Sequence, residues 1–182
     1  ILPEGKDEEI YENAKSAFDR AMKHMVKDEP CMYLYKEGNE NFSQRGFILV
    51  VSLEDYEQGG IKKHEETREK PLNDRIKHID ATRANTGIVW TIFRRKNEIK
   101  KIMDDIISQT PVFDFDKYGY NHKLWKIYGD TISKIKSSFL NTDLYIADGH
   151  HRIRAAYEYM KRHNNDEAKY VMVFVASDDE VR

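Results

Sequence analysis

The chain has 182 residues, of which 40% are hydrophobic and 34% are charged, and this is enough apolar material for one folded core. Its 30 Lys and Arg residues nearly balance 32 Asp and Glu residues, so the net charge is −2. No long run of one charge sign is present, and binding to duplex nucleic acid or to an anionic membrane requires a basic surface. We therefore expect a protein that binds neither. Because the first thirty residues are charged throughout and lack the apolar stretch of a signal peptide, we expect it to be cytoplasmic.

The chain is expected to fold as a single domain over residues 1–182, because no linker or internal repeat is visible and domains typically have about 100 to 200 residues. No apolar stretch reaches the roughly 18 residues of a membrane-spanning helix. The chain starts at Ile1 rather than at Met, so we interpret it as a fragment of a longer protein. The lone Cys31 lies in an apolar run and is predicted to be a buried structural thiol.

In the first third of the chain, the hydrophobic pattern predicts one helix and one hairpin. Apolar residues spaced by three and four predict an amphipathic helix over residues 8–26, which Pro30 is expected to end. Two apolar runs, residues 32–35 and 46–53, are separated by a segment rich in Gly and Asn. This arrangement is typical of an antiparallel hairpin.

The next segment, residues 61–71, is highly charged and has too few apolar residues for a core element, so we predict a loop that is exposed or covers a ligand. Pro71 suits the first turn of a helix that runs to about residue 84. Strands and helices then alternate: strands 87–93, 112–115, 123–128, 144–147 and 170–176, and helices 98–107, 131–140 and 151–162. The fold class predicted is α/β or α+β, with a mixed sheet and flanking helices.

The most informative residues are Asp148-Gly149-His150-His151-Arg152, which join an apolar strand to an amphipathic helix. Such a turn presents free backbone N–H groups and the positive end of the helix dipole, which attract a phosphate or a carboxylate. Gly149 lets the ligand approach the backbone, and Arg152 can make two parallel bonds to a phosphate. The two histidines can donate to phosphate oxygens or transfer a proton, and Asp148 can hold a divalent cation. An Asp cap followed by surface histidines is the alternative, and the pattern alone leaves it open.

A second cluster, His-Glu-Glu-Thr at residues 64–67, lies in the charged segment. A carboxylate beside an imidazole can act as a general base, with the imidazole orienting it or binding an oxyanion. The zinc-protease pattern is not met, because Arg68 stands where a second His would be needed. Solvated surface charge is the alternative interpretation. Arg75 and Asn85, near the two ends of the next predicted helix, could reach the same cleft.

These blocks resemble a known family. Residues 61–85, with His64-Glu65-Glu66-Thr67 and Asp74-Arg75, are followed by Ala147-Asp148-Gly149-His150-His151-Arg152 in the order found in the uncharacterised bacterial and archaeal family called domain of unknown function ten-fifteen. Gly46 in the second hairpin strand matches as well. Members of that family are longer than this chain, which agrees with its interpretation as a fragment.

The Asp-Gly-His-His-Arg turn is also similar to the phosphate-binding turn of the ParB and sulfiredoxin superfamily, which includes free-serine kinases with Asp-Gly-His-Thr-Arg. This resemblance implies a ParB/sulfiredoxin-like core with a strand-turn-helix phosphate site. Sulfiredoxin has a Cys where His150 stands here, which disfavours sulfinic-acid repair. ParB uses this fold to bind nucleotide and clamp DNA, and it also has a helix-turn-helix domain, which has no counterpart in this sequence.

The leading hypothesis is therefore a nucleotide-dependent phosphotransferase, a small-molecule kinase acting on serine or a similar hydroxyl metabolite. The resemblance of the turn to that of the free-serine kinases implies Mg²⁺ with ATP or ADP. Asp148 is then the candidate metal ligand, and residues 148–152 are the site for the nucleotide phosphates. The other residues assigned are Glu65, His64, His150 and His151 for catalysis, and Thr67, Arg75 and Asn85 for substrate binding. Two alternatives stay open: a nucleotide- or phosphate-binding regulatory module without catalysis, and a metal-dependent hydrolase using His64, His150 and His151.

Overall fold

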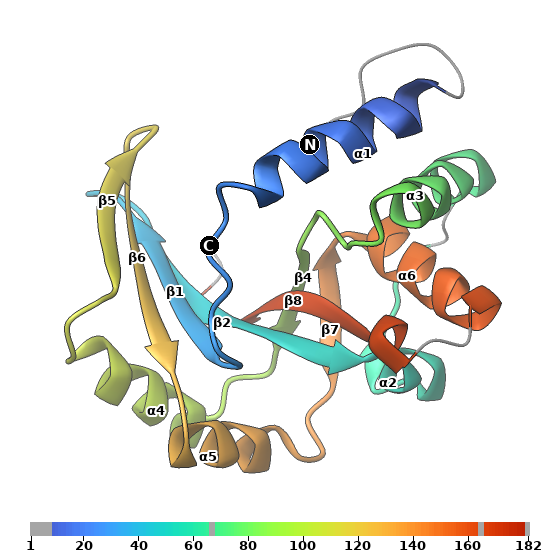
Figure 1. Ribbon diagram of the computed structural model, residues 1–182. Helices are drawn as coiled ribbons and strands as arrows, with labels where there is room; N and C mark the ends of the chain where they lie inside the picture. Colours follow the sequence, from blue (N-terminus) through green and yellow to red (C-terminus); the bar gives the residue numbers. More distant parts are fainter. Residues whose placement is uncertain (1–8, 66–67, 164–165, 181–182) are drawn as a thin grey trace.

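The computed structural model describes residues 9–65, 68–163 and 166–180, and it places every described strand in one mixed sheet (Figure 1). The strand order is β3-β7-β4-β8-β2-β1-β6-β5. Two pairs, β3 with β7 and β4 with β8, are parallel, and the other neighbours are antiparallel. The strands are β1 Met32–Gly38, β2 Ser43–Ser52, β3 Ile61–Lys62, β4 Val89–Phe93, β5 Phe113–Lys117, β6 Tyr120–Ile127, β7 Leu144–Asp148 and β8 Tyr170–Ser177. The predicted mixed sheet is confirmed.

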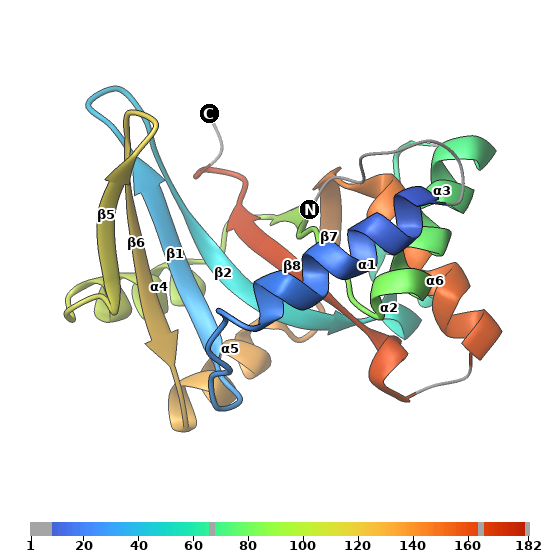
Figure 2. The ribbon, with the colours of Figure 1, turned by 45° about the horizontal axis from the view of Figure 1, so that its top comes forward.

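Helices flank the sheet in two groups. They are α1 Glu9–Met22, α2 Leu53–Gln58, α3 Glu69–Thr82, α4 Asn97–Ile107, α5 Asp130–Phe139 and α6 His150–His163, with the short 3₁₀ helix η1 Asp166–Lys169. Helices α2, α3 and α6 gather near β7 and β4, whereas α4 and α5 lie near β1 and β6 (Figure 1). Helix α3 packs on both α6 and α1, and α1 extends from α3 towards β1 (Figure 2).

The core lies between the helices and one face of the sheet, because alternate residues of each central strand point to that face. Phe47 in β2 and Phe93 in β4 are fully buried. Their rings contact the Phe139 ring of α5 at centroid distances of 6.3 and 5.0 Å. On α4, Ile99 and Met103 lie four residues apart and are both buried, as the helical spacing predicts.

The other face of the sheet carries a row of aromatic rings. The Trp90, Phe174, Tyr35 and His122 rings follow one another across the strands with centroid distances of 6.5, 6.0 and 6.1 Å. Gly46 makes room for this row, since a Cβ atom at that position would lie 2.6 Å from Cε2 of the Phe174 ring. The glycine in β2 is therefore required by the packing of β8.

Three predictions about the first 71 residues were wrong. Helix α1 ends at Met22, short of the predicted residue 26, and Met25 and Val26 beyond its end are exposed, so their burial does not support a longer helix. The charged segment contains β3 and the first residues of α3, and its Ile61 is buried beside Leu144. Cys31 is half-buried rather than buried, and it is a free thiol.

Helix α2 and the short helix η1 were not predicted, and Leu53, expected at the end of a strand, begins α2. The other elements agree with the sequence patterns to within a few residues. Helix α3 has Ile76 and Ile79 buried, as expected from their spacing. Over the residues that the structure describes, no helix has the length and apolar character needed to cross a membrane.

Candidate functional site

The turn between β7 and α6 is formed by Gly149. Its φ of +98° lies in the region that glycine adopts most readily, and its carbonyl accepts hydrogen bonds from the N–H groups of Arg152 (2.9 Å) and Ile153 (3.1 Å). Gly149 therefore caps the helix, and the alternative in which the Asp148 side chain is the cap is wrong. The N–H groups of His150 and His151 precede these first helical bonds and are available to a ligand.

Arg152 sits between two glycines from different segments. A Cβ atom on Gly149 would lie 2.7 Å from its Nε atom, and a Cβ atom on Gly87 would lie 3.0 Å from its Cδ atom. Its guanidinium forms an ion pair with the Asp148 carboxylate, which is 70% exposed. The buried Nε atom has no hydrogen-bond partner in the described part of the chain. The guanidinium is thus held in place while part of its hydrogen-bonding capacity is unused.

The charged segment meets this turn at His150. The Glu65 carboxylate Oε2 lies 3.5 Å from His150 Nδ1, and the His64 ring stands perpendicular to the His150 ring with the centroids 4.3 Å apart. His150 is only 6% exposed, whereas Glu65 is 62% exposed. Residues far apart in sequence therefore come together, with the carboxylate at the surface and the imidazole beneath it.

His150 has a perturbed protonation equilibrium. Burial lowers the pKa of its imidazole below the ordinary value of 6.5, and the neighbouring His64 acts in the same direction. The carboxylates of Glu65 and Asp148 oppose this shift but do not reverse it. His150 is therefore mainly neutral at pH 7, when its ring can donate one hydrogen bond and accept another.

Two cavities flank the first turns of α6. One has a volume of about 200 Å³ and is lined by the guanidinium groups of Arg75 and Arg152, without a carboxylate. Asn85 and Gly87 also line it. The other, of about 260 Å³, has a mixed charge. Its lining residues are Tyr56, Lys63, Glu65, His150, Arg154, Tyr157 and Glu158. The first cavity suits an anion, and the second suits a ligand with polar groups of both signs.

Most residues predicted for the site fall in this region. His64 and Glu65 contact the turn, and Arg75 and Asn85 share a cavity with Arg152. His151 is half-buried on the turn itself, and its Nδ1 atom has no partner in the described structure. Thr67 lies outside the described residues.

Several lining residues of the cavity of mixed charge were not predicted from the sequence. Arg154, Tyr157 and Glu158 follow His150 by four, seven and eight residues, which places them on one face of α6. Once His150 is taken as a site residue, this helical spacing predicts that the three side chains lie on the same side of the helix as His150. Lys63, whose ammonium lies 3.9 Å from the centre of the Tyr56 ring, had no comparable signal because it depends on a contact between segments.

No three His, Cys, Asp or Glu side chains gather as metal ligands within the ranges that the structure describes. His64, His150 and His151, the histidines of the hydrolase alternative, accordingly do not form such a group. Asp148 is the one candidate metal ligand of the turn that is largely exposed, so a ligand's own oxygens would have to complete its coordination.

The chain was compared with known proteins. A family model described as "Protein of unknown function (DUF1015)" matches residues 1–182. Neither the curated proteins nor the solved structures gave a match. The resemblance to domain of unknown function ten-fifteen, inferred from the His-Glu-Glu-Thr and Asp-Gly-His-His-Arg blocks, is confirmed. Because the match spans the whole chain, the protein belongs to the family described as Protein of unknown function (DUF1015).

Proposed function

We propose that the protein is a nucleotide-dependent phosphotransferase, a small-molecule kinase with a ParB/sulfiredoxin-like phosphate turn, which phosphorylates a serine-like hydroxyl compound. The observation that carries this proposal is the 3.5 Å approach of Glu65 to His150. It joins a carboxylate that can take a proton to a helix N-terminus that can bind phosphate. The resemblance to free-serine kinases supports the same chemistry by analogy.

The phosphates of the nucleotide bind on the arginine side of α6. The N–H groups of the first turn, Arg152 and Arg75 supply hydrogen bonds and positive charge there. Each hydrogen bond to a charged phosphate contributes on the order of 1.5 to 3 kcal/mol, so several are needed for useful affinity. A phosphate that binds Arg152 competes with its ion pair to Asp148.

Asp148 would then be available to a Mg²⁺ ion. Protein sites for Mg²⁺ commonly provide one or two carboxylates, and phosphate oxygens and waters complete the octahedron. One exposed carboxylate beside the phosphate turn fits that donor set. When bound, the ion would neutralise part of the charge on the phosphates of ATP or ADP.

The acceptor binds on the other side of His150, in the cavity of mixed charge. The Glu65 carboxylate takes the proton from the acceptor hydroxyl, and the oxygen of that hydroxyl attacks the terminal phosphorus of the nucleotide. A new oxygen–phosphorus bond forms, the bond from that phosphorus to the bridging oxygen breaks, and the shortened nucleotide leaves with the electron pair. The His150 ring, neutral at pH 7, and His64 position Glu65, and Asn85 contacts the substrates.

The substitution Glu65→Gln tests this assignment. We expect nucleotide affinity by calorimetry to be unchanged, because the amide keeps the shape and the phosphate site is separate. Turnover of serine and related hydroxyl compounds, followed as phosphorylated product by phosphorus NMR, should fall at least about a hundredfold, the usual scale for a lost general base. Glu98→Gln in the first turn of α4, at the other end of the molecule, is the matched control and should have no effect (Figure 1).

The outcomes distinguish the alternatives. Full turnover in Glu65→Gln removes Glu65 from the mechanism. Binding of ATP, ADP or CTP by the unmodified chain without product from any acceptor indicates the regulatory module instead. If neither nucleotides nor pyrophosphate bind, both ideas fail.

A further inference from the structure

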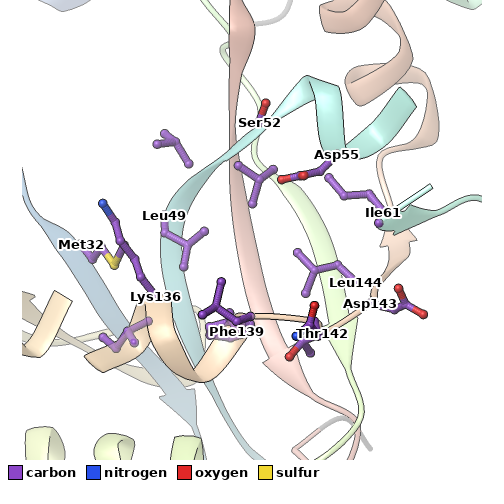
Figure 3. A pocket seen from close by; sticks show the side chains of 16 residues that line it. Met32, Leu49, Ser52, Asp55, Ile61, Lys136, Phe139, Thr142, Asp143 and Leu144 are labelled. Atoms are coloured by element: carbon purple, nitrogen blue, oxygen red, sulfur yellow. The ribbon is translucent and has the colours of Figure 1, made fainter. Parts of the chain in front are cut away.

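The first cavity, lined by Arg75 and Arg152, adjoins another cavity between α3 and α6. We call this neighbour, of about 290 Å³, the α3–α6 cavity, and Ile79 and Asn85 line both. Among the described residues, the first cavity shares no lining residue with the cavity of mixed charge. It also shares none with a larger cavity, of about 460 Å³, that lies over β2 beside Phe139 (Figure 3). A ligand with phosphates at the two arginines therefore extends into the α3–α6 cavity.

The two cavities follow one another along the contact between α3 and α6 (Figure 1). On α3, Arg75 lines the first cavity, Ile79 lines both, and Arg83 at the end of the helix lines the α3–α6 cavity. On α6, Arg152 lines the first cavity and Ala156 lines the α3–α6 cavity. Residues four apart lie on one face of a helix, so both helices present one continuous stripe to this space. Arg75 and Arg83 are about 12 Å apart along the axis, at ~1.5 Å per residue.

The first cavity by itself is too small for a nucleotide. Its volume of about 200 Å³ is below the roughly 300 Å³ at which small-molecule sites begin, and the α3–α6 cavity adds about 290 Å³. The charges differ between the two ends of this space. The first cavity has two guanidinium groups, whereas Arg83 and Glu167 supply one charge of each sign to the α3–α6 cavity. A ligand that fills both cavities therefore has phosphates at one end and an uncharged body at the other.

The wall of the α3–α6 cavity suits a flat ring with polar atoms at its edge. Its aliphatic lining residues are Ile79, Ala84, Ala156 and Ala168. The Arg83 guanidinium donates from Nη1 to the Tyr159 hydroxyl at 2.7 Å, and a planar guanidinium can stack on the face of a ring. Asn85 lies where the two cavities meet, and its carboxamide can both donate to and accept from hydroxyl groups. A heterocyclic base joined to a ribose matches these groups in order.

We propose that the α3–α6 cavity binds the nucleoside of a nucleotide whose phosphates lie in the first cavity. The base packs against Arg83 and the alanines, the ribose lies at Asn85, and the phosphates extend towards the N-terminus of α6. This direction brings the terminal phosphate to the end of α6 at which Glu65 meets His150. The inference rests on the nucleotide binding of the proposed function, but it does not require phosphate transfer.

The test compares ATP with inorganic tripolyphosphate, which has three phosphates and no nucleoside. Each is titrated into the full chain with Mg²⁺ in a calorimeter. We expect ATP to bind at least about 10-fold more tightly, because burial of roughly 60 Å² of apolar base surface is enough for that factor. In Ala168→Leu the larger side chain fills the α3–α6 cavity, so ATP affinity should fall about 10-fold while tripolyphosphate affinity stays unchanged. Ala21→Leu in α1 is the matched control, since Ala21 lines neither cavity, and it should change neither affinity.

A measurement on the unmodified chain decides the matter if Ala168→Leu does not fold. ATP should shift the methyl NMR signals of Ala84 and Ala168, and tripolyphosphate should leave them in place. The inference is overturned if ATP binds no more tightly than tripolyphosphate, if it leaves both methyl signals unshifted, or if Ala168→Leu does not weaken ATP binding selectively. The phosphate site of the proposed function stands in each of these cases.

Two other outcomes separate this inference from the proposed function. If neither compound binds, the phosphate site fails and the inference fails with it. Binding that depends on the nucleoside, without phosphorylated product from any acceptor, supports the inference and counts against the phosphotransferase.

Discussion

Replacement of Gly149 by alanine separates the backbone role of this residue from its role in positioning Arg152. Gly149 has a φ of +98°, and an L-residue in the left-handed region costs about 1 to 2 kcal/mol. The new Cβ atom would also lie 2.7 Å from Nε and 2.9 Å from Nη2 of Arg152. The guanidinium must move and leave Asp148, and a largely exposed ion pair of this kind contributes about 0 to 1 kcal/mol. The free energy of unfolding should therefore fall by about 1 to 3 kcal/mol.

Gly59 provides a matched control. It has a φ of +83°, and a Cβ atom there would meet nothing within 4 Å. The variant Gly59→Ala should carry the backbone cost alone and keep full nucleotide affinity. In Gly149→Ala, displacement of one guanidinium from the phosphate site should weaken ATP binding roughly 10- to 100-fold, which corresponds to about 1.5 to 3 kcal/mol.

Urea unfolding followed by circular dichroism measures the stability of both variants, and calorimetric titration with ATP measures affinity. Equal affinity in Gly149→Ala and in the unmodified chain would show that Arg152 does not bind the phosphates. Equal losses of affinity in the two glycine variants would show that the effect is one of general stability. Either result would refute the reasoning about this turn.

Two further predictions concern the sheet and His150. Gly46→Ala should lower the free energy of unfolding in urea by about 1 to 3 kcal/mol, because its Cβ atom would lie 2.6 Å from both the Phe174 ring and the Val175 carbonyl oxygen. Gly60→Ala is the control, since the nearest neighbour of its Cβ atom would be at 3.5 Å. A similar loss of stability in both variants would contradict the prediction. Burial lowers the His150 pKa below 6.5, so the unfolded chain takes up this proton first and stability should fall as the pH drops below about 6.5 towards the folded-state pKa. The unfolding free energy of His150→Gln should decline less than that of the unmodified chain between pH 7.5 and 5, and an identical decline would count against the shift.

Local sequence patterns predicted many of the strands and helices. The alternation in β8 and the helical spacing of Ile99 and Met103 in α4 are visible in the sequence because each depends on a few consecutive residues. The strand-turn-helix around Gly149 was predicted to within a residue for the same reason. Strand β3 was missed because it has only two residues, and its burial depends on Leu144 from a distant segment.

The sequence by itself determined which chemical groups exist and which lie on a common strand, turn or helix face. It placed Asp148, Gly149 and Arg152 on one turn, since their relation is set by neighbouring backbone angles. Only the tertiary structure decided that Glu65 meets His150 and that Gly87 and Gly149 enclose Arg152. It also decided where the helices leave a cavity over β2. These relations depend on how the sheet orders its strands and on which surfaces the helices cover, and packing across the whole molecule sets both.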